Sequence, residues 1–213
     1  MLRRLRHLHA WTVETCDDRV IGHVDDFRLD HRRWIARFLV VKATSWVPQR
    51  QILIPTLQID GIDWDGARIV TSMTREDVRK IAANPHWVTA PGAEPTSWLH
   101  SVQGTRGCHI QALDGRIGCV EDLLADDDHW GIPYLAVDTS QWIGGSVLVP
   151  SEWTQRVDSQ ARMVHVNRLR DDLKSSLATR RSPWRGDQNC MVIRNHDASN
   201  VNASARSGSS RFN

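Results

Sequence analysis

The hydrophobic and polar positions of the chain form a pattern that occurs twice. Short apolar runs alternate with clusters of Asp, Gly, Ser and Arg, and the runs have the length and composition of β-strands. The pattern that begins at Asp18 returns at Asp114, and the same offset of 96 residues links Trp34 to Trp130. Ordered matches at one spacing indicate an internal repeat. The matching segments are residues 18–27 and 114–123, 39–41 and 135–137, and, after a one-residue deletion, 52–55 and 147–150.

Each copy of the repeat is predicted to be a series of short strands. Polar turns at residues 30–33 and 126–129 interrupt the apolar pattern, and their length is common for a hairpin loop. Pro55 and Pro150 end the next apolar run of each copy, because proline cannot donate a hydrogen bond to a sheet. The predicted strands are 18–27, 34–41, the run ending at 55, 58–64 and 68–72 in the first copy, and 114–123, 130–137, the run ending at 150, 154–157 and 162–166 in the second.

A short helix is predicted to close each copy. Thr74 is a candidate N-cap with an acid, Asp77, three residues further on, and a basic residue follows at Lys80. The second helix is predicted to begin near Asn167, a favourable N-cap, and to run to about Leu177. Short strands, frequent turns and one terminal helix favour a small barrel, whose closure hides the strand edges.

The predicted fold is therefore mainly β, with two tandem small β-barrels, each followed by a short helix. Between the copies the chain is rich in Pro, Gly, Ser and Thr, and beyond them Ser, Asn, Arg and Gly dominate. The predicted boundaries are residues 10–83 for the first repeat, 84–107 for a linker, 108–178 for the second repeat and 179–213 for a disordered basic tail.

Charge is distributed unevenly along the chain. The net charge is +2, of which residues 1–9 contribute +3 and residues 179–213 contribute +4, so the body between them carries −5. A nucleic-acid binder normally has a basic face on its folded part, so this distribution argues against nucleic acid as the main partner. The second copy has six basic and eleven acidic residues over 109–178. We expect the barrels to be packed as a pseudo-dimer with an acidic outer face that suits a basic partner.

Apolar runs and cysteines bear on the location of the protein. No run approaches the roughly 18–20 apolar residues that a helix needs to cross a bilayer, so no membrane-spanning segment is predicted. The cysteines Cys16, Cys108, Cys119 and Cys190 lack the close or regular spacing of disulfide frameworks and zinc sites. We expect separate reduced thiols in a cytoplasmic protein.

Residues 114–150 carry a family resemblance. They read Asp-Gly-Arg-Ile-Gly-Cys-Val-Glu-Asp, then a turn of acids and a Trp, then Tyr-Leu-Ala-Val-Asp-Thr, and finally a Trp and Val-Leu-Val-Pro. This pattern resembles the PRC-barrel family, and residues 18–55 match it more loosely. The resemblance extends over about residues 10–177 and implies a stand-alone bacterial protein with two such units.

The resemblance also implies a kind of function. The family includes the cytoplasmic domain of the photosynthetic reaction centre H subunit and the C-terminal domain of a ribosome-maturation factor. It implies a non-enzymatic module for protein interaction or assembly, which we expect to serve a membrane complex of the reaction-centre type or a stress response. Two alternatives stay open, an RNA- or ribosome-associated maturation factor and a small-ligand or metal-binding protein.

Few residues have the spacing that catalysis or metal binding requires. Asp126, Asp127 and Asp128 suit a hard cation, but no EF-hand spacing follows them, and the first copy has Asp30-His31-Arg32-Arg33 in the same place. A solvated hairpin turn is therefore favoured. No Ser-His-Asp, Cys-His or paired-carboxylate set can be assigned from spacing. We assign no catalytic residue, no metal ligand and no cofactor.

The tryptophans give the more useful indication of a surface. Trp34 and Trp130 begin strands, and we expect them to have a structural role at the barrel ends. Trp46 and Trp142 fall in turns, where Trp is harder to bury, and Trp is enriched at binding hot spots. We expect a protein partner, with RNA or a second copy of this chain as alternatives. The candidate interaction surface consists of Trp46, Trp142, Asp126, Asp127 and Asp128.

Overall fold

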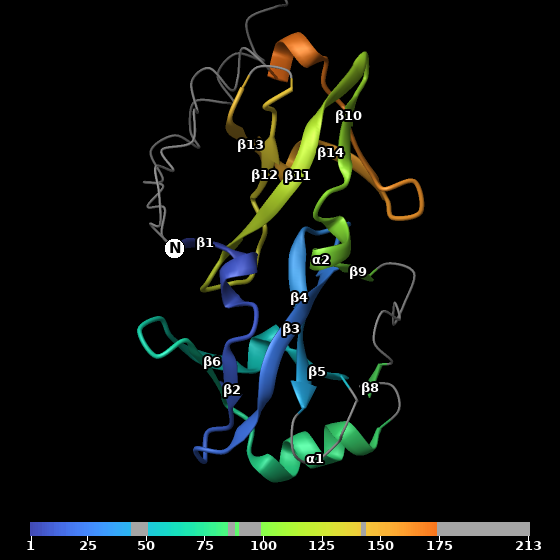
Figure 1. The fold of residues 1–213 in the computed structure, drawn as a ribbon. Coiled ribbons are helices and arrows are strands. Elements are labelled where there is room, and N and C mark those ends of the chain that lie inside the picture. The colour runs from blue at the N-terminus through green and yellow to red at the C-terminus, as the bar shows by residue number, and fades with distance from the viewer. Residues whose placement is uncertain (44–50, 85–87, 90–98, 142–143, 174–213) are drawn as a thin grey trace, which may run out of the picture.

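The chain folds mainly into β-strands, as the sequence pattern predicts. The computed structural model describes residues 1–43, 51–84, 88–89, 99–141 and 144–173, with two sheets one above the other in Figure 1. The first sheet contains β2 (Thr12–Glu14), β3 (Val20–Asp30), β4 (Ile35–Ala43), β5 (Gln51–Pro55), β6 (Ile59–Asp63), β7 (Arg68–Thr71), β8 (Val88–Thr89) and β9 (Leu99–Ser101). Its order is β6-β7-β2-β3-β4-β5-β8, and β9 pairs with β3.

The second sheet repeats the order of the first. It contains β1 (Leu2–Arg4), β10 (His109–Ala112), β11 (Gly115–Asp126), β12 (Tyr134–Asp138), β13 (Ser146–Pro150), β14 (Thr154–Asp158) and β15 (Met163–Val166). The order β14-β15-β10-β11-β12-β13 matches the first sheet read from β6 to β5, and β1 pairs with β11. In both sheets the strand that opens the repeat lies parallel to the last one, β2 with β7 and β10 with β15, which makes both sheets mixed.

Short helices occur between and after the strands. Thr74 caps α1 (Arg75–Ala83) through a capping box with Asp77, as predicted. The helix expected near Asn167 begins at Arg170, and its continuation beyond residue 173 lies outside the described residues. Within the described residues, no helix is long and apolar enough to cross a membrane. The remaining short elements are η1 (Leu5–Leu8), η2 (Thr56–Gln58), α2 (Val102–Thr105) and η4 (Ser151–Trp153).

The sheets differ from the predicted barrels in one respect. In the part of the chain that the structure describes, neither sheet closes on itself through strand pairing, because β6 and β14 remain open edges. The expectation of closed barrels is therefore not met. The long strands β3 and β11 bend instead at register shifts, which curve each sheet around its apolar face.

Each sheet also receives a strand from a segment that the sequence assigned to neither repeat. We call residues 1–9 the N-terminal leader and residues 99–107 the inter-repeat leader. β1 of the N-terminal leader lies along the end of β11, with Leu2 opposite Asp126. β9 of the inter-repeat leader lies along the end of β3, with Leu99 opposite Asp30. Asp30 and Asp126 are equivalent positions, so the two repeats exchange leader strands reciprocally.

The two hairpin tips meet where the sheets cross. Trp34 and Trp130 have φ values of 51° and 59°, in the left-handed region that residues other than glycine rarely adopt. The N–H of Ala36 donates to the carbonyl oxygen of Trp130 over 2.9 Å, and the N–H of Ile132 donates to that of Trp34 over 2.6 Å. The same backbone conformation in both copies therefore gives each tip a partner in the other.

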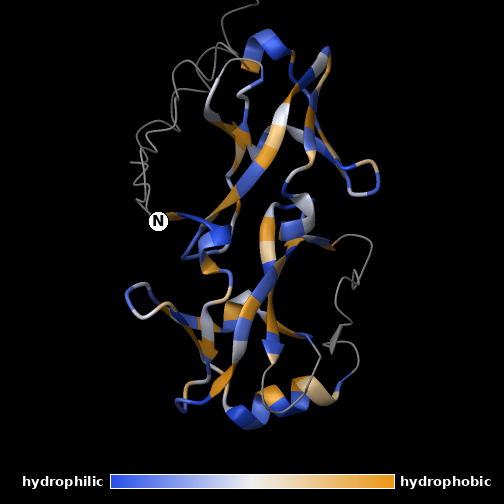
Figure 2. Ribbon diagram, viewed as in Figure 1, coloured by the Kyte–Doolittle hydropathy of each residue, from blue (hydrophilic) through white to orange (hydrophobic). Residues whose placement is uncertain are grey.

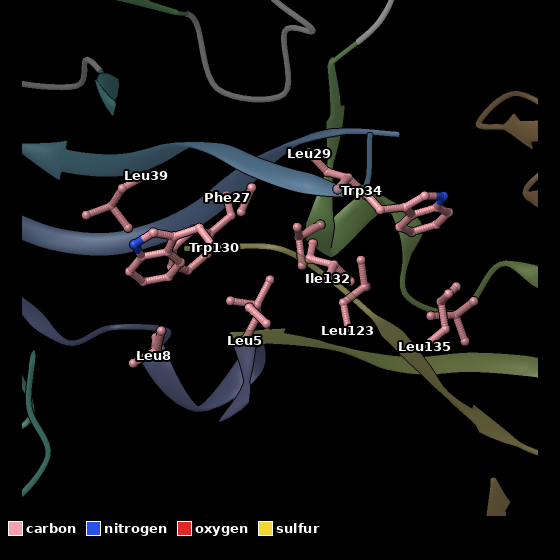
Figure 3. Close-up of a cluster of buried hydrophobic side chains, with 14 of the residues drawn as sticks. Leu5, Leu8, Phe27, Leu29, Trp34, Leu39, Leu123, Trp130, Ile132 and Leu135 are labelled. Atoms are coloured by element: carbon pink, nitrogen blue, oxygen red, sulfur yellow. The ribbon is translucent and has the colours of Figure 1, made fainter. Parts of the chain in front are cut away.

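One hydrophobic core runs through both repeats. Trp130 stacks on Phe27 of the first repeat, with 5.5 Å between ring centroids, whereas Figure 3 shows Trp34 directed toward Leu135 of the second. The predicted structural role of these tryptophans is confirmed, since they are buried, but they lie between the repeats. Figure 2 shows apolar residues recurring along β3 and β11, the strands that carry this core from one half to the other.

Candidate functional site at the seam between the repeats

The predicted interaction residues fall in two places. Trp46 and Trp142 lie outside the described residues, so their role stays a prediction. The three consecutive acids begin at Asp126, the last residue of β11, and continue into the turn that leads to Trp130. The structure therefore bears only on the acidic half of the predicted surface.

The acidic turn already contacts a basic segment of the same chain. The amino group of Met1 lies 3.1 Å from Oδ1 of Asp126 and 2.5 Å from Oδ1 of Asp127, and Nε of Arg3 lies 3.3 Å from Oδ2 of Asp127. Hydrogen bonding to Asp127 is the main cause that raises the pKa of this amino group to about 10. The N-terminal leader thus already contacts Asp126 and Asp127, two of the acids predicted to face a basic partner.

The same turn brings together three groups that could hold a cation. Ligand atoms of Asp126, Asp128 and His129 lie within 4.8 Å of one another, and His129 Nδ1 is 3.4 Å from Asp126 Oδ2. Asp128 and His129 are exposed, and Asp126 also accepts a hydrogen bond from the amino group of Met1. Exposed acids in a turn commonly group in this way, so the arrangement agrees with a solvated hairpin turn and we assign it no ligand.

The leaders are anchored by two buried acids at equivalent positions of the long strands. Oδ1 of Asp26 accepts the backbone N–H of Gln103 over 3.0 Å, and its Oδ2 accepts the hydroxyl of Ser101 over 2.6 Å. Oδ1 of Asp122 accepts the backbone N–H of Arg6 over 3.3 Å. Each repeat thus presents one buried carboxylate to the leader of the other.

Burial perturbs both of these carboxyl groups. It raises the pKa of Asp26 above its ordinary value, against the hydrogen bond from Ser101. It raises the pKa of Asp122 from 3.8 to about 6. Nε of Arg6 lies 3.5 Å from Oδ2 of Asp122, and this oxygen is buried without a hydrogen-bond partner among the described residues. The positive charge therefore offsets only part of the cost of burying the carboxylate.

Arginines complete the contact around Glu121. Arg4 is buried with Nη1 2.6 Å from Oε1 of Glu121, and Nη1 of Arg6 lies 3.2 Å from the same oxygen. Burial acts to raise the pKa of Glu121, but hydrogen bonds from Ser146 and Arg4 and the charges of both arginines outweigh it and lower the pKa. We call this cluster of cross-repeat polar contacts the seam, and its members are Arg4, Arg6, Asp26, Ser101, Gln103, Glu121 and Asp122.

Sequence reasoning did not find the seam. A usable sign was present, because Asp26 and Asp122 occupy the same position of the repeat, each followed directly by an apolar residue of the core, Phe27 or Leu123. An acid retained in both copies at such a position indicates a buried partner. Its partners come from short leaders without a hydrophobic period, and no pattern in the chain marks them.

An open groove lies at the far end of the first repeat. It runs beside α1 and is lined by Pro55, Met73 and Ile81, with Asp77 and Lys80 among its polar residues. Leu57, next to Pro55-Thr56 in η2, has 84% of its side chain exposed. Pro55 and Gln58, which flank this leucine closely in the sequence, both line the groove, and we take the two features together as a candidate surface for a protein contact.

A search against models of protein families and a search of curated proteins both found no match to this chain.

Proposed function

We propose that this chain is a non-enzymatic, PRC-barrel-like module for protein interaction or assembly in the cytoplasm, with its two repeats arranged as a pseudo-dimer. The reciprocal exchange of leader strands supports the pseudo-dimer most directly. The strand order, shared by the two sheets, adds to it. On this proposal the protein serves as a scaffold, attached to a membrane complex or to a stress-response assembly.

One observation carries the proposal. The buried ionisable groups of the seam bind segments of the chain itself: Asp26 holds the inter-repeat leader and Asp122 holds the N-terminal leader. Such groups are often arranged around a substrate in enzymes, whereas the partners named here are backbone N–H groups, the hydroxyl of Ser101 and arginines of the same chain. What remains for a partner is the outer surface, including the groove beside α1. Trp46 and Trp142 stay predicted interaction residues that lie outside the described residues.

The RNA-binding alternative loses part of its basis. It relied on basic ends of the chain, and the N-terminal arginines Arg3, Arg4 and Arg6 are engaged by acids of the second repeat. The C-terminal residues 174–213 lie outside the described residues and keep their basic composition. An RNase-sensitive interaction that depends on the tail is the result that would favour this alternative.

The test is affinity purification of the tagged full-length chain from its native cells, with and without RNase. We expect a dominant protein partner that resists RNase. Leu57→Asp and the double variant Trp46→Ala/Trp142→Ala are compared with the wild type, and Asp60→Asn, an exposed acid on β6, is the control. Loss of the partner with either surface variant supports the proposal. Recovery of ribosomal proteins alone, which RNase removes, contradicts it.

A further inference from the structure

A cysteine and a histidine meet on the outer face of the second sheet. Cys119 on β11 lies opposite His109 on β10, and its Sγ is 3.2 Å from Nδ1 of the imidazole. The side chains of both residues are half-buried, while their neighbours Ile110 and Val120 point into the core. On the other side of Cys119, β12 places the exposed Asp138 in register. Sequence spacing could not reveal this pair, because only the register of two strands brings it together.

The other described cysteines have different surroundings. Cys16 is exposed. Cys108 is buried, its Sγ donates to the carbonyl oxygen of Gly104 over 3.3 Å, and burial raises the pKa of its thiol. Burial therefore favours the protonated thiol of Cys108, whereas the Sγ of Cys119 lies against a ring nitrogen of His109.

The fold itself does not require this pair. At the equivalent positions the first repeat has Thr12 on β2 and His23 on β3, which form the same register pair. Lys42 of the first repeat takes the place of Asp138. The two sheets have the same strand order although only the second has a thiol at this position. The fold can therefore form without a cysteine at position 119.

We propose that Cys119 and His109 form a reactive thiol–imidazole pair, a modification site for small oxidants and soft electrophiles. In the tautomer with its proton on Nε2, Nδ1 of His109 accepts the thiol hydrogen, and the resulting thiolate is the nucleophile. With a peroxide, the sulfur attacks one oxygen, the O–O bond breaks, and hydroxide leaves and is protonated by the imidazolium. Sulfur is oxidised to sulfenic acid and the peroxide is reduced. With iodoacetamide, an S–C bond forms as iodide leaves.

Competitive alkylation of the folded full-length chain tests the proposal. The protein is treated with limiting iodoacetamide near neutral pH, and the modified fraction of each cysteine is followed by peptide mass spectrometry. If exposure alone governed the rate, Cys16 would react faster than the half-buried Cys119. We expect the opposite order, with Cys119 roughly tenfold faster than Cys16, and we expect the order to reverse or vanish in urea.

Two histidine variants identify the cause. His109→Gln removes the basic nitrogen and is expected to bring the rate of Cys119 to that of Cys16 or below. His165→Gln, a half-buried position on neighbouring β15, is the control and should leave the rate unchanged. Circular dichroism shows whether each variant is folded. The proposal fails if Cys119 of the wild type is slower than Cys16, a comparison that needs no variant, or if folded His109→Gln keeps the wild-type rate.

A second readout uses the oxidant. Peroxide followed by dimedone, which traps sulfenic acid, is expected to label Cys119 ahead of Cys16 and Cys108 in the wild type. Equal labelling of Cys16 and Cys119 would overturn the assignment of Cys119 as the preferred site for oxidants.

Discussion

At the scale of single residues, Gly22 and Gly118 occupy equivalent positions where two neighbouring strands approach too closely for any other residue. A Cβ atom at Gly22 would lie 2.2 Å from the carbonyl oxygen of Lys42, and one at Gly118 would lie 2.0 Å from that of Asp138. No side chain fits at such distances, so the backbone itself would have to move. The glycine of the Ile-Gly motif, which occurs in both repeats, is therefore explained by this close contact between neighbouring strands.

Gly118→Ala is expected to destabilise the protein by about 1–3 kcal/mol, the usual cost of forcing an extra group into a packed site. Gly61→Ala is the matched control, because a Cβ atom there meets nothing within 4 Å. Urea unfolding of both variants measures the free energies. Equal stability of the two variants would show that β11 and β12 can separate at no cost.

The buried carboxyl group of Asp122 makes the free energy of unfolding depend on pH. Its pKa is about 6 in the folded protein against 3.8 as the ordinary value, because the carboxyl group is buried. The folded state thus binds this proton more tightly than the unfolded chain. The contribution of Asp122 to folding is therefore most favourable below the ordinary value, declines as the pH rises toward about 6 and then stays constant.

Asp122→Asn is expected to remove this dependence. The free energy of unfolding of the variant, relative to the wild type, should rise between about pH 4 and about pH 6, by at most on the order of 3 kcal/mol. Urea titrations at several pH values measure it, with the exposed Asp60→Asn as the control. If the curves of Asp122→Asn and wild type run parallel over this window, the carboxyl group is not perturbed in the way described.

At the scale of elements, the repeat predicted five strands of each copy, but the predicted ranges omit β2 and β10, which open the two repeats, and the strands of both leaders. β6 (Ile59–Asp63) and β7 (Arg68–Thr71) lie within the strands expected at 58–64 and 68–72, because turn residues bound each apolar run. β1 and β9 have three residues each, too few to show a period. Their pairing is set by contacts more than a hundred residues away for β1 and about seventy for β9, which no local pattern encodes.

The N-terminal leader is expected to stabilise the second repeat through its apolar residues. Leu5 in η1 has 2% of its surface exposed, so Leu5→Ala leaves a cavity in the shared core and is expected to cost about 2–5 kcal/mol. Leu57→Ala, at a position that is 84% exposed, should cost little. Chemical denaturation gives both values. Hydrogen exchange adds a local measurement, since amides of β11 near Asp126 should lose protection in Leu5→Ala.

At the scale of the whole molecule, the sequence suggested two successive domains, whereas the core is continuous. The cluster that includes Leu39 of the first repeat also includes Leu135 of the second, and Trp130 of the second repeat stacks on Phe27 of the first. Composition and periodicity describe each repeat separately. They cannot say which repeat receives a given tryptophan or leader, because both repeats offer the same apolar surface.

The continuous core predicts that the repeats unfold together. Leu39 and Leu135 are equivalent, fully buried residues of β4 and β12. Leu39→Ala and Leu135→Ala should therefore each lower the melting temperature of one common transition in calorimetry, and should speed hydrogen exchange in peptides from both repeats. Independent domains would behave differently: Leu39→Ala would then shift one of two transitions and leave exchange in β12 and β13 unchanged. That outcome would mean the exchanged leaders and tryptophans bring the repeats into contact without coupling their stability, and the proposed pseudo-dimer would be an arrangement of two autonomous folds.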